Sequence, residues 1–213
     1  MNKLNKKIFW IASYPKSGNT WMRAIVSSLF FSENGVFNFG LFKSIPNFEK
    51  KENYYFISKL NKDDFNNINN LKIISKYRLE AQKRVNIING DFAFFKTHSA
   101  NIDVDNFKYT SNETTLGVIY LTRDPRDIVL SLSHHKGSTI DAIIKLMIDE
   151  GAIYNVQFPN ILSSWNHHYR SWLNLNVPKL IIKYEDLSNN TEKVLWNIVN
   201  FFQKNYKLEF KNV

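Results

Sequence analysis

Three short clusters of polar residues hold the side chains with which this sequence can do chemistry. The first cluster, residues 14–21, reads Tyr-Pro-Lys-Ser-Gly-Asn-Thr-Trp and lies between an apolar run and a helical pattern. Gly18 lets the backbone approach a ligand closely, the amides of residues 17–20 point out of a helix N-terminus, and Lys16 adds a positive charge. These features predict a phosphate cradle.

This cradle differs from the P-loop of nucleoside triphosphatases. The pattern Gly-x-x-x-x-Gly-Lys-[Ser/Thr] is absent, and Lys16 precedes Gly18 instead of following it. The alternative interpretation of residues 14–21 is an ordinary turn between a strand and a helix that carries a surface lysine.

The second cluster, Lys96-Thr97-His98, follows a short apolar run. If the alternation of a strand persists through this point, Lys96 and His98 project to the same side and can face one ligand. A neutral imidazole there can accept a proton from a reacting group. The alternative is a polar loop that contains a lysine and a histidine without a function.

The third cluster begins at Arg123 and extends to Ser131. The planar guanidinium of Arg123 suits a phosphate, and Ser131, about two helical turns further on, can donate a hydrogen bond to the same group. This pattern predicts a second anion site. The alternative is that Arg123 pairs with Asp124 or Asp127 and that Ser131 only fills space.

The elements that must position these clusters are strands and helices in alternation. Apolar runs at 7–13, 92–95, 116–122 and 180–183 predict strands, and helical patterns follow at 20–31, from 125 onward and at 191–202. This order predicts an α/β fold, a three-layer sandwich with a central, mainly parallel sheet, similar to P-loop nucleotide-binding folds. In such sheets ligands bind at the carboxyl ends of the strands, and each polar cluster follows a strand.

The length and composition bound the class of protein. The 213 residues predict one domain (1–213), with an irregular insertion at about 32–90 whose best helical pattern covers 71–85. A net charge of +9 favours anionic partners, and zero cysteines exclude disulfides, thiolate zinc sites and a cysteine nucleophile. The apolar run at 8–12 is too short for a signal peptide, and no run approaches the ~20 apolar residues that span a bilayer. We expect a cytoplasmic protein without a membrane span.

With these motifs identified, the chain resembles the sulfotransferases that use 3'-phosphoadenosine 5'-phosphosulfate (PAPS). Residues 14–21 resemble the family's 5'-phosphosulfate loop, Tyr-Pro-Lys-Ser-Gly-Thr-Thr-Trp, with Asn19 as the one change. Residues 120–131 resemble its 3'-phosphate motif, including the spacing of eight from arginine to serine. Residues 95–98 match its Lys-Thr-His motif, and residues 183–187 match its later Tyr-Glu-Asp-Leu. The four matches occur in family order.

The resemblance implies a role for each of these residues. His98 would be the general base on the acceptor, and Lys16 and Lys96 would stabilise the charge that develops on the leaving phosphate oxygen. Trp21 would pack against adenine, and Arg123 with Ser131 would hold the 3'-phosphate, which remains in the product PAP (3'-phosphoadenosine 5'-phosphate). The amides and hydroxyls of the cradle would hold the 5' end; they belong to Ser17, Gly18, Asn19 and Thr20.

Two departures from the family pattern bear on activity. Ser99 and Ala100 stand where the family usually has Leu-Pro after its histidine, which changes the wall on the acceptor side. The sequence ends at Val213, before the Arg-Lys-Gly segment that closes over the 3'-phosphate in eukaryotic cytosolic members, so the C-terminal part of the family domain is expected to be missing. The alternative to an active enzyme is therefore a truncated, weakly active or non-catalytic protein that binds PAP or another anion.

Other features carry less chemistry. The Tyr-Glu-Asp-Leu of 184–187 is interpreted as structural, and Trp165, His168 and Trp172 as a core stripe with one hydrogen-bonded histidine. We expect no metal site, because adjacent histidines on a helix point about 100° apart and no carboxylate completes either pair.

Two rival functions and the partners remain. A small-molecule kinase is disfavoured because no Walker lysine or magnesium-binding aspartate is visible, and a nucleic-acid-binding module would need one continuous basic stripe. We expect no nucleic-acid partner. The acceptor is left open among small molecules, carbohydrates and peptides, with residues 32–90 and 136–160 expected to line its pocket, and the oligomeric state is not predicted.

Overall fold

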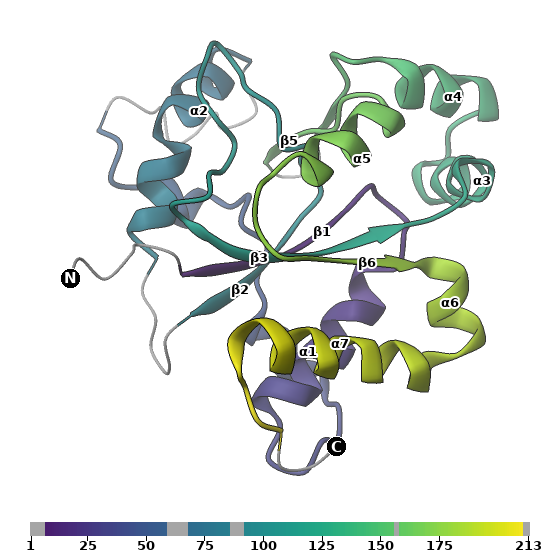
Figure 1. Cartoon of the computed structure of the whole chain (residues 1–213). Helices are drawn as coiled ribbons and strands as arrows, with labels where there is room; N and C mark the ends of the chain where they lie inside the picture. The colour runs from purple at the N-terminus through teal and green to yellow at the C-terminus, as the bar shows by residue number, and fades with distance from the viewer. Residues whose placement is uncertain (1–6, 59–67, 86–91, 156–157, 211–213) are drawn as a thin grey trace.

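The centre of the protein is a parallel sheet covered by helices on both faces. The computed structural model describes residues 7–58, 68–85, 92–155 and 158–210. Within these residues the sheet has four strands in the order β2-β1-β3-β6, all parallel. Their bounds are β1 Ile8–Ser13, β2 Ala93–Thr97, β3 Thr115–Thr122 and β6 Lys179–Lys183. The predicted α/β class with a central parallel sheet is confirmed (Figure 1).

The inner strands are apolar along their whole length because helices cover both sides of the sheet. Every residue of β1 is buried, and β3 is buried at six of its eight positions. Strands covered on both faces are expected to read as continuous apolar runs rather than as alternating patterns. This explains why the four strands are visible in the sequence within one or two residues of their observed ends.

One face of the sheet is covered by α1 (Asn19–Phe31) and α7 (Thr191–Tyr206), with the short α6 (Tyr184–Asn189) leading into α7 (Figure 1). The core on this side is aromatic. The ring of Phe9 lies 5.3 Å from that of Phe94 and 5.1 Å from that of Phe202, measured between centroids. The ring of Phe30 on α1 lies 4.8 Å from those of Phe94 and Phe202, so this packing holds the first and last helices against the same strands.

The opposite face is covered by α2 (Ile68–Lys83) and α5 (Trp165–Leu173) (Figure 1). Trp10 and Trp172 are fully buried there, and the indole of Trp10 donates to the hydroxyl of Thr115 at 3.1 Å. The predicted core stripe on α5 is confirmed for His168 and Trp172, which are both fully buried.

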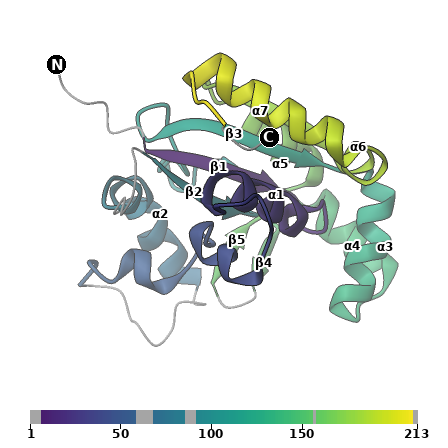
Figure 2. The same cartoon turned by 90° about the horizontal axis from the view of Figure 1, so that it is seen from below.

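The carboxyl end of the sheet is bordered by α3 (Pro125–Lys136) and α4 (Ile140–Ile148), as Figures 1 and 2 show. Asp124 caps α3 by accepting from the backbone N–H of Arg126 at 2.9 Å, and Pro125 occupies the first helical position. This start of α3 was predicted from the sequence, whereas α4 and the hairpin of β4 (Ile153–Asn155) with β5 (Pro159–Ile161) were not.

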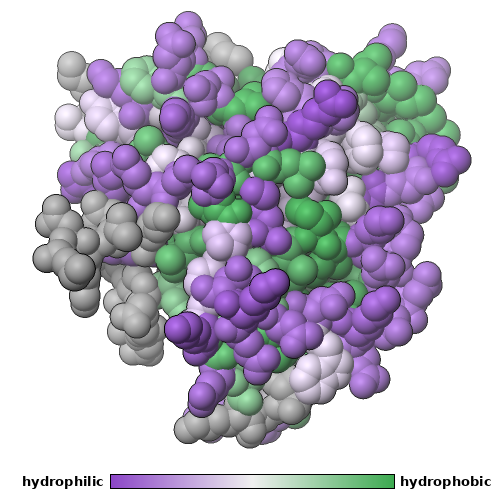
Figure 3. Space-filling model, in the orientation of Figure 1, coloured by the Kyte–Doolittle hydropathy of each residue, from purple (hydrophilic) through white to green (hydrophobic). Residues whose placement is uncertain are grey.

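An apolar patch lies on the surface over α3 and α4. Leu130, Ile144 and Ile148 are exposed there, and Figure 3 shows apolar side chains gathered over these helices at the upper right. None of the described helices is both long enough and apolar enough to cross a membrane.

The insertion at 32–90 is more ordered than we expected in the parts that the structure describes. It contains two 3-10 turns, η1 (Phe39–Ser44) and η2 (Lys51–Tyr54), in addition to α2. Phe48 and Tyr54 are fully buried in the same cluster as Trp10. Residues 59–67 and 86–90 of this segment lie outside the described residues.

Candidate functional site

The three polar clusters meet at the carboxyl end of the sheet, around a cleft of about 710 Å³. The cleft is lined by nine of the ten residues that the sequence singled out. These nine are Lys16, Gly18, Asn19, Thr20, Trp21, Lys96, His98, Arg123 and Ser131. The tenth, Ser17, is fully buried, and its hydroxyl has no hydrogen-bond partner among the described residues.

The turn between β1 and α1 has the backbone of an anion cradle. Gly18 is the N-cap of α1 with φ of 91°, and it brings no side-chain cap. The first four amides of a helix lack partners within the helix, and the first turn of α1 has no acidic residue to occupy them. Lys16 also has a positive φ, of 67°, which a residue with a side chain adopts only at a cost.

Gly18 is needed for space as well as for conformation. A Cβ atom at this position would lie 2.8 Å from the Cδ2 of Tyr184. The ring of Tyr184, at the start of α6, therefore packs directly on the turn and lines the cleft. We interpreted residues 184–187 as structural, and sequence reasoning missed this position of Tyr184. One feature of the sequence could have indicated it: Tyr184 directly follows the carboxyl end of β6, as the other polar clusters follow their strands.

Asn19 ties the turn to β1. Its side-chain nitrogen donates to the carbonyl of Ile11 and to the hydroxyl of Ser13, both at 3.1 Å. This amide is 6% exposed, so its hydrogens are directed into the protein. Asn19 therefore makes two contacts that hold the cradle on the strand.

His98 is held in one tautomer. Its Nδ1 lies 2.9 Å from the carbonyl oxygen of Ser13, which can only accept, so Nδ1 carries the proton and Nε2 is left as an acceptor. Burial, followed by the nearby Lys96, lowers the pKa of His98 from 6.5 to about 3. The imidazole is neutral at neutral pH and can accept a proton through Nε2.

A second histidine supports the backbone of His98. The Nε2 of His168 donates to the carbonyl of His98 at 3.1 Å, and its Nδ1 accepts from the hydroxyl of Tyr120 at 2.8 Å. Burial lowers the pKa of His168 to about 4. The prediction that His168 is the hydrogen-bonded histidine of the core stripe on α5 is confirmed, and His168 contacts the backbone of the histidine that lines the cleft.

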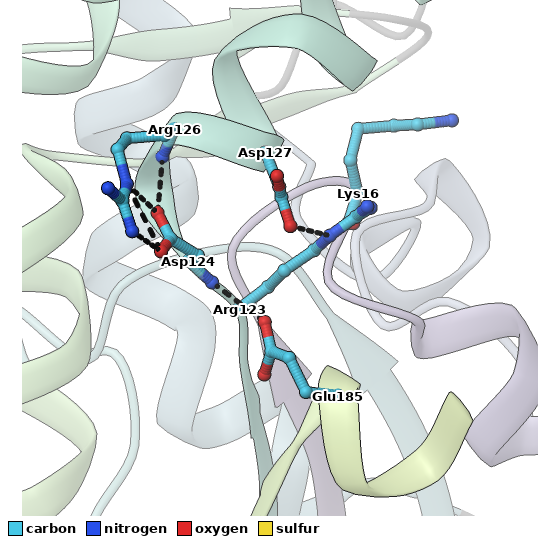
Figure 4. A network of polar contacts seen from close by, with 6 residues as sticks. All are labelled: Lys16, Arg123, Asp124, Arg126, Asp127 and Glu185. Atoms are coloured by element: carbon cyan, nitrogen blue, oxygen red, sulfur yellow. Dashed lines mark hydrogen bonds and ion pairs between the residues drawn. The ribbon is translucent and has the colours of Figure 1, made fainter. Parts of the chain in front are cut away.

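Arg123 connects the two anion motifs (Figure 4). Its Nη1 donates to the backbone carbonyl of Lys16 at 3.0 Å, and its guanidinium carbon lies 4.0 Å from the ring centroid of Tyr184. The alternative pairing with Asp127 exists only as a 3.9 Å approach from Nε. Asp124 instead pairs with Arg126, whose side chain is exposed on α3. The Nη2 of Arg126 lies 2.5 Å from the Oδ2 of Asp124.

The electrostatic character of the cleft is positive. Lys16, Lys96 and Arg123 line it, and no aspartate or glutamate is among its described lining residues. Burial lowers the pKa of Lys96, and the negative charge of Glu49 acts in the opposite direction. No cluster of three potential metal ligands occurs among the described residues. The arrangement suits an organic anion whose charged groups lie close together.

Comparison with known proteins places the chain in a family. Residues 6–211 match the family model described as the sulfotransferase domain. A 3-alpha-hydroxysteroid sulfotransferase of Cavia porcellus is 24% identical over 92% of this chain and 59% of its own length. Cytosolic sulfotransferase 14 of Arabidopsis thaliana is 23% identical over 90% of this chain and 52% of its own length.

The fold is also similar to that of a solved structure. A crystal structure of retinol dehydratase in a complex with retinol and PAP superimposes with a TM-score of 0.51, at 21% identity, over 91% of this chain and 59% of that chain. The chain thus spans between half and three fifths of the length of these proteins. Because the family model covers nearly all of the 213 residues, the chain belongs to the sulfotransferase domain family.

Proposed function

We propose that this protein transfers a sulfuryl group from PAPS to a hydroxyl or amine acceptor. The observation that carries the proposal is the contact between Arg123 and the Lys16 turn, because it joins two anion-binding groups in one cleft. A nucleotide with phosphates at both its 5' and 3' positions presents two such charges a short distance apart. A ligand with one charged end would leave one of these groups without a partner.

The donor would lie across the carboxyl ends of β1 and β3. The amides at the start of α1 and the ammonium of Lys16 would hold the 5'-phosphosulfate, and Arg123 with Ser131 would hold the 3'-phosphate. Trp21 is 38% exposed, and its ring centroid lies 6.5 Å from that of Tyr184. These two rings would contact the adenine.

The reaction would be an in-line transfer with His98 as the base. The Nε2 of His98 takes the proton of the acceptor, the acceptor oxygen or nitrogen forms a bond to sulfur, and the bond from sulfur to the 5'-phosphate oxygen breaks. The negative charge that develops on this oxygen is stabilised by Lys16 and Lys96. The protein supplies positioning and electrostatics, and PAP is the product.

The acceptor is proposed to be a small apolar compound with a hydroxyl group. Phe37, Phe39 and Phe42 line the cleft, and the ring of Phe37 lies 5.4 Å from that of Phe39 and 5.1 Å from that of Phe42. Such a group of rings can pack against the apolar body of an acceptor. The name of one of the relatives described above refers to a hydroxysteroid, and the name of the other refers to a cytosolic enzyme, which supports a cytoplasmic location.

The kinase alternative finds no support in the cleft. Magnesium in phosphoryl transfer is usually held by carboxylates, and no carboxylate is among the described residues that line this cleft.

A comparison of three nucleotides tests the donor assignment. PAP should raise the melting temperature far more than AMP or ATP with magnesium, since a ligand at about 100 times its dissociation constant adds about 2.7 kcal/mol of stability. Equal shifts with PAP and AMP would contradict the 3'-phosphate site. Transfer is then tested with labelled PAPS and a panel of phenols, sterols and sugars. A protein that binds PAP but transfers label to none of them would support the alternative of a non-catalytic PAP-binding protein.

A further inference from the structure

A buried carboxylate lies directly behind the candidate catalytic residues. Glu49 is 2% exposed and does not line the cleft. Its Oε1 accepts hydrogen bonds from the hydroxyl of Thr97 at 2.7 Å and from that of Tyr109 at 2.6 Å. Thr97 stands between Lys96 and His98, so Glu49 contacts the one residue of this motif that points away from the cleft.

The backbone before Glu49 forms the outer neighbour of β2. The N–H of Lys96 donates to the carbonyl of Pro46 at 2.9 Å, and the N–H of Phe48 donates to the carbonyl of Lys96 at 3.0 Å. β2 is the edge of the sheet, so this segment satisfies backbone groups that would otherwise have no partner there. Glu49 follows immediately, and its carboxylate is thereby delivered to Thr97.

Thr97 transmits this contact to His98. A threonine hydroxyl has one proton to donate, and here it is directed to Glu49. The oxygen is then free to accept, and two donors reach it: the backbone N–H of Ser99 at 2.9 Å and the hydroxyl of Tyr109 at 2.7 Å. The bond from Ser99 spans His98. The acceptor supplied by Glu49, together with the hydroxyl of Tyr109, sets the orientation of the Thr97 hydroxyl and with it the turn that carries His98.

The burial of Glu49 is costly, which argues that it has a use. Its Oε2 has no hydrogen-bond partner among the described residues. The nearby guanidinium of Arg78 lies 5.0 Å from the ring centroid of Tyr109 and is 1% exposed, but it makes no ion pair with Glu49. A buried charge with incomplete pairing destabilises a fold relative to an apolar side chain of the same size. Support of the site accounts for a carboxylate at this position.

We propose that Glu49 is a positioning residue for sulfuryl transfer, which acts through Thr97 to hold Lys96 and His98 in their reacting geometry. The inference rests on the proposed function, because it assigns Glu49 a part in that reaction. Glu49 touches neither the donor nor the acceptor, so it is expected to affect the rate of transfer and not the affinity for PAP.

Three variants test the route. Glu49→Met removes the acceptor at nearly constant volume, Glu49→Gln keeps an oxygen that Thr97 can reach, and Thr97→Val removes the hydroxyl while it leaves the bond between Glu49 and Tyr109. Glu52→Gln changes an exposed glutamate three residues away and is the matched control. The readouts are kcat and KM for labelled transfer from PAPS to the best phenol or sterol of the panel, per PAP-binding site, and the Kd of PAP from calorimetry.

We expect Glu49→Met and Thr97→Val each to lower kcat by about 10- to 100-fold, with the Kd of PAP nearly unchanged. Glu49→Gln should recover most of the rate. The double variant Glu49→Met with Thr97→Val should be no slower than the slower single variant, because both changes break the same route. As a second measurement, nitrogen-15 spectra of the histidine side chains should show a single Nδ1-protonated form of His98 in the parent and a mixture in Thr97→Val.

Other outcomes overturn the inference. A Glu49→Met protein with the parental kcat per PAP-binding site would show that Glu49 serves only folding. If the fold-losses in kcat of the two single variants multiply in the double variant, Glu49 and Thr97 act independently. If the nitrogen-15 signal of His98 is unchanged in Thr97→Val, Thr97 does not position His98, and this result holds even if Glu49→Met does not fold. A parent protein that neither binds PAP nor transfers label would overturn the proposed function itself, together with this inference.

Discussion

Arg123 and Lys16 are 107 positions apart in the sequence, and the Nη1 of Arg123 donates to the backbone carbonyl of Lys16 at 3.0 Å. Lys16 has a backbone φ of 67°, a conformation that residues other than glycine seldom adopt. The side chain of one anion motif therefore stabilises the strained turn of the other. A change at Arg123 should affect both ends of the bound nucleotide.

Replacement of Arg123 by alanine should remove the preference of the protein for PAP over AMP. The loss combines a charge-assisted contact to the 3'-phosphate with a looser Lys16 turn, and we expect the Kd of PAP to rise by at least about 10-fold. Arg126→Ala is the control, since Arg126 is exposed and its side chain contacts Asp124. Calorimetric titration with PAP and AMP measures the effect, and equal losses in the two variants would argue against a specific role for Arg123.

Gly18→Ala should destabilise the fold and abolish PAP binding. The new methyl group would stand 2.8 Å from Tyr184, in addition to the strain of φ at 91°. Gly137→Ala provides a matched comparison, because Gly137 also has a positive φ, of 61°, but nothing within 4 Å of the added carbon. It should cost about 1–2 kcal/mol from backbone strain alone. Thermal unfolding of both variants checks the difference, and similar losses would mean that Tyr184 moves aside easily.

The strain at Lys16 is separable from its charge. Lys16→Ala and Lys16→Gly both remove the ammonium, so both should lose most of the transfer rate. Glycine adopts positive φ freely, so Lys16→Gly should be more stable than Lys16→Ala by about 1 kcal/mol. Chemical denaturation of the two proteins gives this difference. A less stable glycine variant would show that the turn relaxes when the nucleotide is absent.

His98→Gln should abolish most of the transfer and leave PAP binding nearly intact. The glutamine can keep a contact to the carbonyl of Ser13 but cannot accept the acceptor's proton as an imidazole does. His134→Gln, at an exposed histidine of α3, is the control. Rates and PAP titrations are compared for the same preparations. Loss of PAP binding together with the rate would mean that His98 has a structural role.

The stability of the protein should fall on mild acidification. The pKa values of His98 and His168 are about 3 and about 4 in the folded protein, against an ordinary value of 6.5. At pH values between the lowered pKa values and 6.5, these histidines bind protons in the unfolded chain but not in the folded chain. The free energy of unfolding therefore decreases as the pH falls below about 6.5. Melting curves at about pH 7.5 and about pH 5 test this. His98→Gln should show a shallower dependence, and a flat curve in the parent would contradict the buried neutral state.

The sequence by itself determined the strands, the order of the motifs and the family. Buried strands read as apolar runs, and a helix start reads as the Asp124-Pro125 cap, because both patterns record the local state of the backbone. The polar residues that follow these strands were legible for the same reason. Residues 14–21 could be interpreted as an anion cradle without knowledge of anything else in the chain.

Only the tertiary structure decided which of these residues meet. It placed Tyr184 on the Gly18 turn, turned the side-chain nitrogen of Asn19 into the protein and set Glu49 behind Thr97 across 48 positions of sequence. Such contacts depend on how strands pair and how an irregular segment packs on the sheet edge. No local pattern encodes them, because the energy of a long-range contact appears only when both partners are already held in place.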